Sequence, residues 1–101
     1  MKYRIRFLPD AKTDLTDIKT YLNQFYIGTT KRFLTLLKKK ITRLRDFPYS
    51  CPAYEDDPDY RKLAVGDYLA FYMVNEDENF VEVHRIFHGS RDIKQHLDRQ
   101  E

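Results

Sequence analysis

The side chains best suited to take part in a reaction are cations and imidazoles toward the end of the chain. Arg61, Arg85 and His88 stand where the strands predicted below begin or end. Such groups could cleave RNA without a metal, because a base can take the proton of a 2′-hydroxyl, an acid can protonate the leaving oxygen, and cations can stabilise the phosphorane. The alternative is that both arginines form structural ion pairs with Asp92, Glu82 or a chain terminus.

Other common kinds of site have less support in the sequence. His84 and His88 are predicted on one strand face, but Cys51 is distant and no carboxylate pair lies beside them, so we expect no metal site. Cys51 lies in no recognised nucleophile motif, and a lone cysteine is more often packed and inert. There is no glycine-rich phosphate loop, so we expect no cofactor. The acids Asp56, Asp57 and Asp59 favour a solvated loop over a cation site or a hydrolase pair.

Composition indicates a single globular domain. The chain has 101 residues, of which 42% are hydrophobic and 15% aromatic, and we expect residues 1–101 to form one domain with one core. Cys51 has no partner for an internal disulfide, which favours a reducing compartment, and the cytoplasm is the expected location. No apolar stretch is long enough for a membrane span and the N-terminus does not look like a signal peptide, so no membrane partner is expected.

Charge is segregated along the chain although its net value is only +2. Residues 31–45 contain seven basic side chains and no acid, whereas acids crowd residues 55–59. Such a local positive field could steer an anionic partner. The alternative is that the basic run is the solvated face of a helix.

The beginning of the chain predicts a strand followed by a helix. Tyr3, Ile5 and Phe7 alternate with basic residues, which is the period of a half-buried strand over about residues 2–7. Pro9 suits the first turn of a helix. Apolar residues then recur at intervals of three and four and predict one helical stripe: Ala11, Leu15, Ile18, Leu22 and Phe25. The solvent side of this helix is expected to carry Lys12, Asp14, Asp17 and Lys19.

A second helix is predicted after Gly28, which breaks the first one. Thr29 or Thr30 is expected to cap its N-terminus, and the helix should end near Asp46 because Pro48 disfavours helical conformation in the residue before it. Its inner face is expected to carry Phe33, Leu37, Ile41 and Leu44. Two adjacent amphipathic helices predict an antiparallel helical hairpin laid on a sheet.

The second half of the chain predicts a meander of strands. Residues 48–59 contain three of the four prolines and are expected to be a loop. Gly66 and Asp67 are typical of a two-residue hairpin turn. The remaining predictions are strands over 60–65, 68–74 and 80–88, a polar turn over 75–79 and a short terminal helix over 91–99.

These elements predict an α+β fold. We expect a small, mainly antiparallel sheet in the order β-α-α-β-β-β, with the helical hairpin packed on one face and the first strand either beside strand 68–74 or at an edge. The face toward the helices is expected to carry Leu63, Val65, Leu69, Phe71, Met73, Val81, Val83 and Phe87. The opposite face is expected to be polar and aromatic, with Lys62, Tyr68, Tyr72, Glu82, His84 and His88. Alternation puts Arg85 with the apolar set, so it lies either near a strand end or beside a bulge.

Four segments give the chain a family resemblance from end to end: PDAKTDLTDIKTYL, GTTKRFLTLLKKKITRLRDFP, YRKLAVGDYLAFYMV and VEVHRIFHGSRDI. The last two are the most specific, with an Arg-x-Leu strand, a Gly-Asp hairpin with tyrosine, and a terminal His-Gly-x-Arg-Asp. The chain resembles the RelE/ParE superfamily of toxins from bacterial toxin–antitoxin pairs. The resemblance implies a cognate antitoxin that wraps the toxin and neutralises it.

The resemblance implies one of two activities. RelE-like members are metal-free endoribonucleases that act on mRNA in the ribosome, and ParE-like members inhibit DNA gyrase. We expect the ribosome and mRNA as partners, with gyrase as the alternative. Many members have an arginine where this chain has Leu69, and no tyrosine follows His88, so the gyrase alternative stays open.

The resemblance also assigns roles to single residues. Arg61 corresponds to the arginine that opens the second strand, Arg85 to the cation of the last strand, and His88 to the polar or imidazole residue at its end. These three are the predicted catalytic residues. The predicted RNA-binding residues are Lys38, Lys39, Lys40, Arg43, Lys62 and Arg91.

Overall fold

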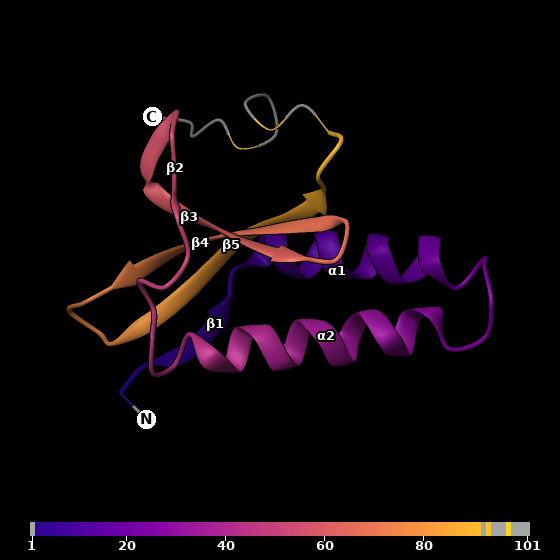
Figure 1. Ribbon diagram of the computed structural model, residues 1–101, viewed down its shortest axis with the longest axis horizontal. Helices are drawn as coiled ribbons and strands as arrows, with labels where there is room; N and C mark the ends of the chain where they lie inside the picture. The colour runs from indigo at the N-terminus through magenta and orange to yellow at the C-terminus, as the bar shows by residue number, and fades with distance from the viewer. Residues whose placement is uncertain (1, 92, 94–96, 98–101) are drawn as a thin grey trace.

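The computed structural model describes residues 2–91, 93 and 97, and two helices and five strands lie within them (Figure 1). The elements follow the chain in this order: β1 Arg4–Phe7, α1 Pro9–Leu22, α2 Thr29–Arg43, β2 Ala53–Tyr54, β3 Asp57–Val65, β4 Tyr68–Asn75 and β5 Phe80–His88. The predicted α+β class is confirmed. The expected terminal helix over 91–99 falls mostly on residues outside the described part of the chain.

One five-stranded sheet forms the centre of the fold, with the spatial order β1-β5-β4-β3-β2. β3, β4 and β5 form the predicted antiparallel meander. β1 lies parallel to β5 at one edge, which is one of the two positions that the sequence left open. The parallel pairing is possible because the helical hairpin carries the chain from β1 back to the sheet.

The two helices pack antiparallel on one face of the sheet (Figure 1). Their predicted inner stripes are confirmed by burial, except at the end of α1. The side chains that they bury in this first core include Ala11, Ile18, Leu22, Phe33, Leu37, Ile41 and Leu44. Phe25 was predicted in the same stripe, but α1 ends at Leu22 and Phe25 is 52% exposed. That prediction is wrong because the periodic pattern continues past the end of the helix.

The start of α2 also differs from the prediction. Gly28 is its N-cap residue, with φ of 90°, and no side chain caps the helix. The hydroxyl of Thr30 instead donates to the Asn23 side chain at the end of α1, at 2.5 Å. The threonine cap predicted at Thr29 or Thr30 is therefore wrong, and the hydrogen bond of Thr30 joins the two helices.

One of the strand predictions needs correction and another is confirmed. Residues 48–59 were expected to be a loop, but they contain β2 and the beginning of β3. Tyr54 explains this pairing, because its buried ring packs edge-on against Phe71 of β4 and holds β2 on the sheet. The Gly66–Asp67 hairpin is confirmed, with Gly66 at φ of 61° between Val65 and Tyr68.

A bulge in β5 changes which side chains share a face. Phe71 of β4 pairs with Arg85, but the next residue, Tyr72, pairs with Val83, so His84 is an extra residue in β5. Before the bulge, Val83 points to the helices, and after it Ile86 does so. The bulge that the sequence offered as one explanation of Arg85 is therefore present.

The predicted assignment of the faces is wrong for two groups of residues. Tyr68 and Tyr72 belong to the core under the helices, and the bulge also puts His88 on that side. The opposite face was expected to be polar, but it buries a second hydrophobic cluster. Its members are Tyr54, Tyr60, Phe71, Phe87 and Leu97, with Leu69, Met73 and Ile93 packed against them. The reason is that β4 is apolar on both faces, so that alternation alone could not tell its two sides apart.

Candidate functional site

A pocket of about 600 Å³ opens between α1 and the last part of β5. β1 ends at Phe7, so β5 has no strand neighbour on this side beyond Val83, and α1 packs there instead. The polar side chains that line the pocket include Asp14, Asp17, Arg85, His88, Ser90 and Arg91. Tyr21 and Tyr68 add aromatic walls. Of the predicted site residues, Arg85, His88 and Arg91 are thus brought together.

Arg85 is held by Asp14 of α1. Its Nε and Nη2 donate to the two carboxylate oxygens of Asp14, at 2.8 and 3.0 Å. The same carboxylate accepts the backbone N–H of Ile86 at 2.9 Å, which satisfies a donor at the open edge of β5. The hydrogen bond to Asp14 raises the pKa of Arg85 further, so this guanidinium stays charged. Asp14 was predicted on the solvent side of α1, and this is wrong, since only 12% of its side chain is exposed.

His88 lies at the exposed end of β5, where its ring packs edge-on against Tyr68 with centroids 5.4 Å apart. Its Nδ1 accepts the backbone N–H of Ser90 at 3.1 Å and lies 2.7 Å from the Ser90 hydroxyl. Because Nδ1 accepts a hydrogen bond, the proton of the neutral ring is assigned to Nε2. Nε2 can therefore donate to a bound oxygen. Burial raises the pKa of Tyr68, so that its phenol stays neutral beside this ring.

Arg61 is not among the residues of this pocket. Its guanidinium donates to the backbone carbonyls of Cys51, at 2.7 Å, and Tyr49, at 3.4 Å, and lies over the Tyr49 ring at 4.9 Å. The alternative ion pair of Arg61 with Glu82 is absent from the described residues, where its guanidinium binds backbone carbonyls instead, and Asp92 and the chain termini lie outside those residues. Arg61 holds the segment before β2 against the sheet. The structure therefore separates Arg61 from Arg85 and His88.

The predicted RNA-binding cations lie on several surfaces. Lys38, Lys39 and Arg43 follow the outer side of α2, and Lys40 donates to the Ala64 carbonyl at 2.8 Å. Lys62 lies on the other face of the sheet, with its Nζ 5.8 Å from the centre of the Tyr54 ring, and Arg91 lines the pocket beside His88.

Two carboxylates of α1 complete the charge balance of the pocket. Asp14 and Asp17 offset Arg85 and Arg91, so the pocket is nearly neutral when His88 is uncharged. The sequence did not single out either acid as functional. Their spacing of three residues puts both on one side of α1, and that periodicity was the available signal. Only the packing of α1 against β5 shows that this side faces Arg85.

Within residues 2–91, 93 and 97, no three metal-ligating side chains come together as a group. None of the helices there has the length and the apolar character that a membrane crossing requires.

Comparison with solved structures shows which known proteins share the fold. The isolated RelE toxin of E. coli matches with a TM-score of 0.62 and 17% identity over 94% of each chain. A chain of the RelBE2 toxin–antitoxin complex of Mycobacterium tuberculosis gives a TM-score of 0.61 and 17% identity over 87% of this chain and 99% of that one. A chain of the ParDE system of P. aeruginosa gives a TM-score of 0.60 and 13% identity over 86% and 96%. The fold is that of RelE/ParE toxins.

Comparison with family models is more specific. The model of the ParE toxin of the type II toxin–antitoxin system parDE matches residues 5–93. The chain therefore belongs to this family of toxins. The search of curated proteins gives no match.

Proposed function

We propose that this toxin is a metal-free, ribosome-dependent endoribonuclease that cuts mRNA in the pocket around His88. In this proposal residues 1–101 form a single toxin domain, which acts in the cytoplasm and is neutralised by a cognate antitoxin. The observation that carries the proposal is the pocket itself, where an imidazole with a donor at Nε2 lies with two guanidinium groups and two tyrosines. Toxins of the same fold have been solved in complexes with antitoxins, which supports the neutralising partner.

The proposed reaction is an attack by a ribose 2′-oxygen on the adjacent phosphorus. The O2′–P bond forms and the P–O5′ bond breaks, which leaves a 2′,3′-cyclic phosphate and a 5′-hydroxyl end. His88 acts as the acid once its Nδ1 is also protonated, a form in which Nδ1 gives up the bond from the Ser90 N–H and donates to the Ser90 hydroxyl instead. It then gives its Nε2 proton to the departing 5′-oxygen, and Asp17 is the carboxylate that can take the 2′-hydroxyl proton. Arg85 and Arg91 stabilise the phosphorane. Arg61 acts from outside the pocket by holding the segment before β2.

The basic side chains outside the pocket would position the toxin on the ribosome. Contacts to phosphates are mainly electrostatic and carry no sequence information, which suits a docking role. We assign this role to Lys38, Lys39, Lys40, Arg43 and Lys62.

Inhibition of DNA gyrase is the second candidate, and two observations favour it. Asp14 already neutralises Arg85, so a phosphate entering the pocket has to displace a bidentate carboxylate. A toxin that binds a protein target needs no free cation in this pocket. The family model that matches the chain is also that of the ParE toxin, and not a RelE model.

An experiment with purified toxin separates the two candidates. Translating ribosomes with a defined mRNA are incubated with toxin, and new 5′ ends are mapped by primer extension, while supercoiling by gyrase is measured in parallel. Cleavage should leave 5′-hydroxyl ends, and His88→Ala should lower its rate about 100-fold or more, since general acids contribute that much.

The matched control for the pocket is an arginine elsewhere. Arg91→Ala should slow cleavage, whereas Arg4→Ala, on the exposed side of β1, should leave it unchanged. Intact mRNA together with inhibited supercoiling would replace the nuclease proposal by the gyrase one. An antitoxin encoded next to the toxin should abolish either activity.

A further inference from the structure

The edge of the Arg85 guanidinium that suits a phosphate is already occupied. Its Nε and Nη2 donate to the two carboxylate oxygens of Asp14, at 2.8 and 3.0 Å. A phosphate that binds a guanidinium in the bidentate mode uses the same kind of parallel N–H donors. The Asp14 carboxylate and a phosphate therefore exclude each other at this edge of Arg85.

Asp14 has a second anchor, which does not involve Arg85. Its Oδ2 also accepts the backbone N–H of Ile86 at 2.9 Å, in the part of β5 that has no strand neighbour on this side. The Arg85 side chain is 26% exposed and lines the pocket of about 600 Å³, so an entering anion reaches it from solvent. Arg85 can therefore exchange one anion for another while Asp14 stays bound to the strand.

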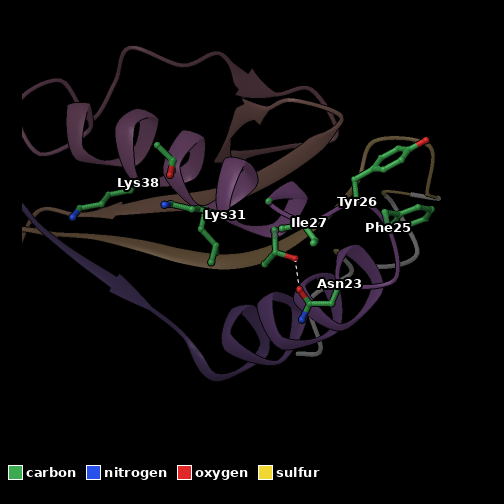
Figure 2. A pocket seen from close by; sticks show the side chains of 10 residues that line it. Asn23, Phe25, Tyr26, Ile27, Lys31 and Lys38 are labelled. Carbon is green, nitrogen blue, oxygen red and sulfur yellow. Dashed lines mark hydrogen bonds between the residues drawn. The ribbon is translucent and has the colours of Figure 1, made fainter.

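The charges that line the pocket around His88 give a phosphate in solution little attraction, because two aspartates there offset two arginines. Another pocket, of about 680 Å³, lies at the connection between α1 and α2, and we call it the lysine pocket (Figure 2). Lys31 and Lys38 line it, and none of the described residues around it is an acid. An anion that follows charge alone is therefore attracted to the lysine pocket, and not to the pocket around His88.

We propose that Asp14 determines the specificity of the pocket around His88, because it keeps out RNA in solution and admits only RNA that the ribosome holds in place. This inference rests on the proposed nuclease function. Asp14 acts through Arg85 and is a positioning residue. The affinity of a site that is open in only a fraction of the molecules is reduced by that fraction. A strand held beside the docked toxin has an effective concentration that RNA in solution does not reach, so it displaces Asp14.

A purely structural Asp14 predicts the opposite result. If the carboxylate only oriented Arg85 for catalysis, its removal would lower kcat on the ribosome and would leave the binding of RNA in solution as weak as before. A carboxylate that competes with phosphate predicts stronger binding after its removal. The two roles of Asp14 therefore differ in the sign of the effect.

The first measurement is the binding of an RNA oligonucleotide by fluorescence anisotropy, without ribosomes and at constant salt. The oligonucleotide carries 2′-fluoro groups, so it lacks the attacking hydroxyl and stays intact. Asp14→Asn keeps an acceptor for the Ile86 N–H and should bind this RNA at least about tenfold more tightly than the wild type. The matched control is Asp10→Asn, the same loss of charge one turn earlier at an exposed position of α1, which should change the affinity by less than about twofold.

Two double variants locate the RNA. Asp14→Asn combined with Arg85→Ala should lose the gain in affinity, because the gain depends on this guanidinium. Lys31→Ala with Lys38→Ala removes the cations of the lysine pocket, and adding Asp14→Asn to this pair should still produce the gain. Asp14→Ser, a second neutral replacement, should bind RNA as tightly as Asp14→Asn. Circular dichroism under the assay conditions confirms that each variant is folded.

The second measurement is RNA cleavage with and without ribosomes. Asp14→Asn should cut RNA in solution with a kcat/KM about tenfold above that of the wild type, while its kcat on translating ribosomes stays within about twofold of the wild-type value. The preference for ribosome-held mRNA over RNA in solution therefore falls, whereas a merely structural role of Asp14 would lower both rates.

Three outcomes would overturn the role of Asp14. They are an affinity of Asp14→Asn no higher than that of Asp10→Asn, a gain that persists with Arg85→Ala, and a fall of kcat on the ribosome by more than about tenfold. If the wild type cleaves mRNA on ribosomes and no gain is seen, the nuclease function stands and the role of Asp14 is refuted. If the gain depends on Arg85 and no protein cleaves mRNA there, the nuclease function fails and Asp14 is a competitor of phosphate only.

Discussion

Removal of the Asp14 carboxylate should destabilise the fold more than any other single charge change on α1. Asp14→Ala removes two hydrogen bonds to Arg85 and the acceptor of the Ile86 N–H. The guanidinium then stays beside the strand with no counter-charge, and the edge of β5 loses a satisfied donor. The substitution therefore removes the hydrogen bonds that join α1 to the edge strand β5 at this place.

The magnitude follows from the exposure of the pair. Breaking a fully buried ion pair by removing one partner costs about 3–5 kcal/mol, and a hydrogen bond to a charged group contributes about 1.5–3 kcal/mol. The side chains of Arg85 and Asp14 are 26% and 12% exposed, so water can rehydrate part of the guanidinium. We expect a loss of about 2–3 kcal/mol in the free energy of unfolding, which lowers the melting temperature of a domain of this size by about 10–15 °C.

The assay is chemical denaturation of the wild type and of three α1 variants, with unfolding followed by circular dichroism. Asp17→Ala, one turn further along the helix and exposed, is the matched control and should change stability by less than about 0.5 kcal/mol. Asp14→Asn keeps an acceptor for Ile86 and should lose about half as much as Asp14→Ala. Coupling between Asp14 and Arg85 in a double-mutant cycle should be about 1–3 kcal/mol. A loss at Asp14 no larger than that at Asp17 would refute the reasoning.

Two further predictions concern the hydroxyl groups of tyrosines. Glu76 accepts hydrogen bonds from Tyr3 and Tyr49, which lower its pKa and raise the pKa of Tyr3 to about 12. The stability from these bonds is therefore complete between about pH 4.5 and 10, is lost as pH falls through the folded-state pKa of Glu76, and is lost again as pH rises toward 12. The difference in melting temperature between the wild type and Glu76→Gln should shrink at both extremes, and a constant difference would contradict the assignment. Tyr72→Phe removes the fully buried hydroxyl that donates to the Pro48 carbonyl at 2.7 Å, and should cost about 1–2 kcal/mol in a denaturation experiment, whereas an unchanged stability would show that water replaces the bond.

The fold was largely predictable because its elements are locally consistent. Alternation in Tyr3, Ile5 and Phe7 predicts the first strand, and the glycine of the Gly66–Asp67 turn takes the positive φ that its position requires. The apolar stripes of both helices extend over several turns, so they predict a helix even where a single position would also suit a strand. One exception occurs where a pattern continues after its element has ended, as it does at Phe25.

The candidate site was predictable only in its residue types. The sequence pointed to Arg85 and His88 by their place near a strand end, and the structure brings them to one pocket. It also pointed to Arg61, whose partners are backbone carbonyls that carry no signature in the sequence. Asp14 was overlooked because a carboxylate on a polar helix face is usually solvated.

The sequence by itself determined the elements, their order and the two apolar stripes, because each depends on side chains that are close along the chain. The tertiary structure decided which side chains of those elements face each other and come into contact. A single extra residue, His84, reverses the faces of the end of β5, since strand side chains alternate with a period of two. The early end of β1 leaves an edge that α1 fills, so that Asp14 meets Arg85 across 71 positions of sequence. Contacts of that separation depend on sheet register and helix packing, which no local pattern records.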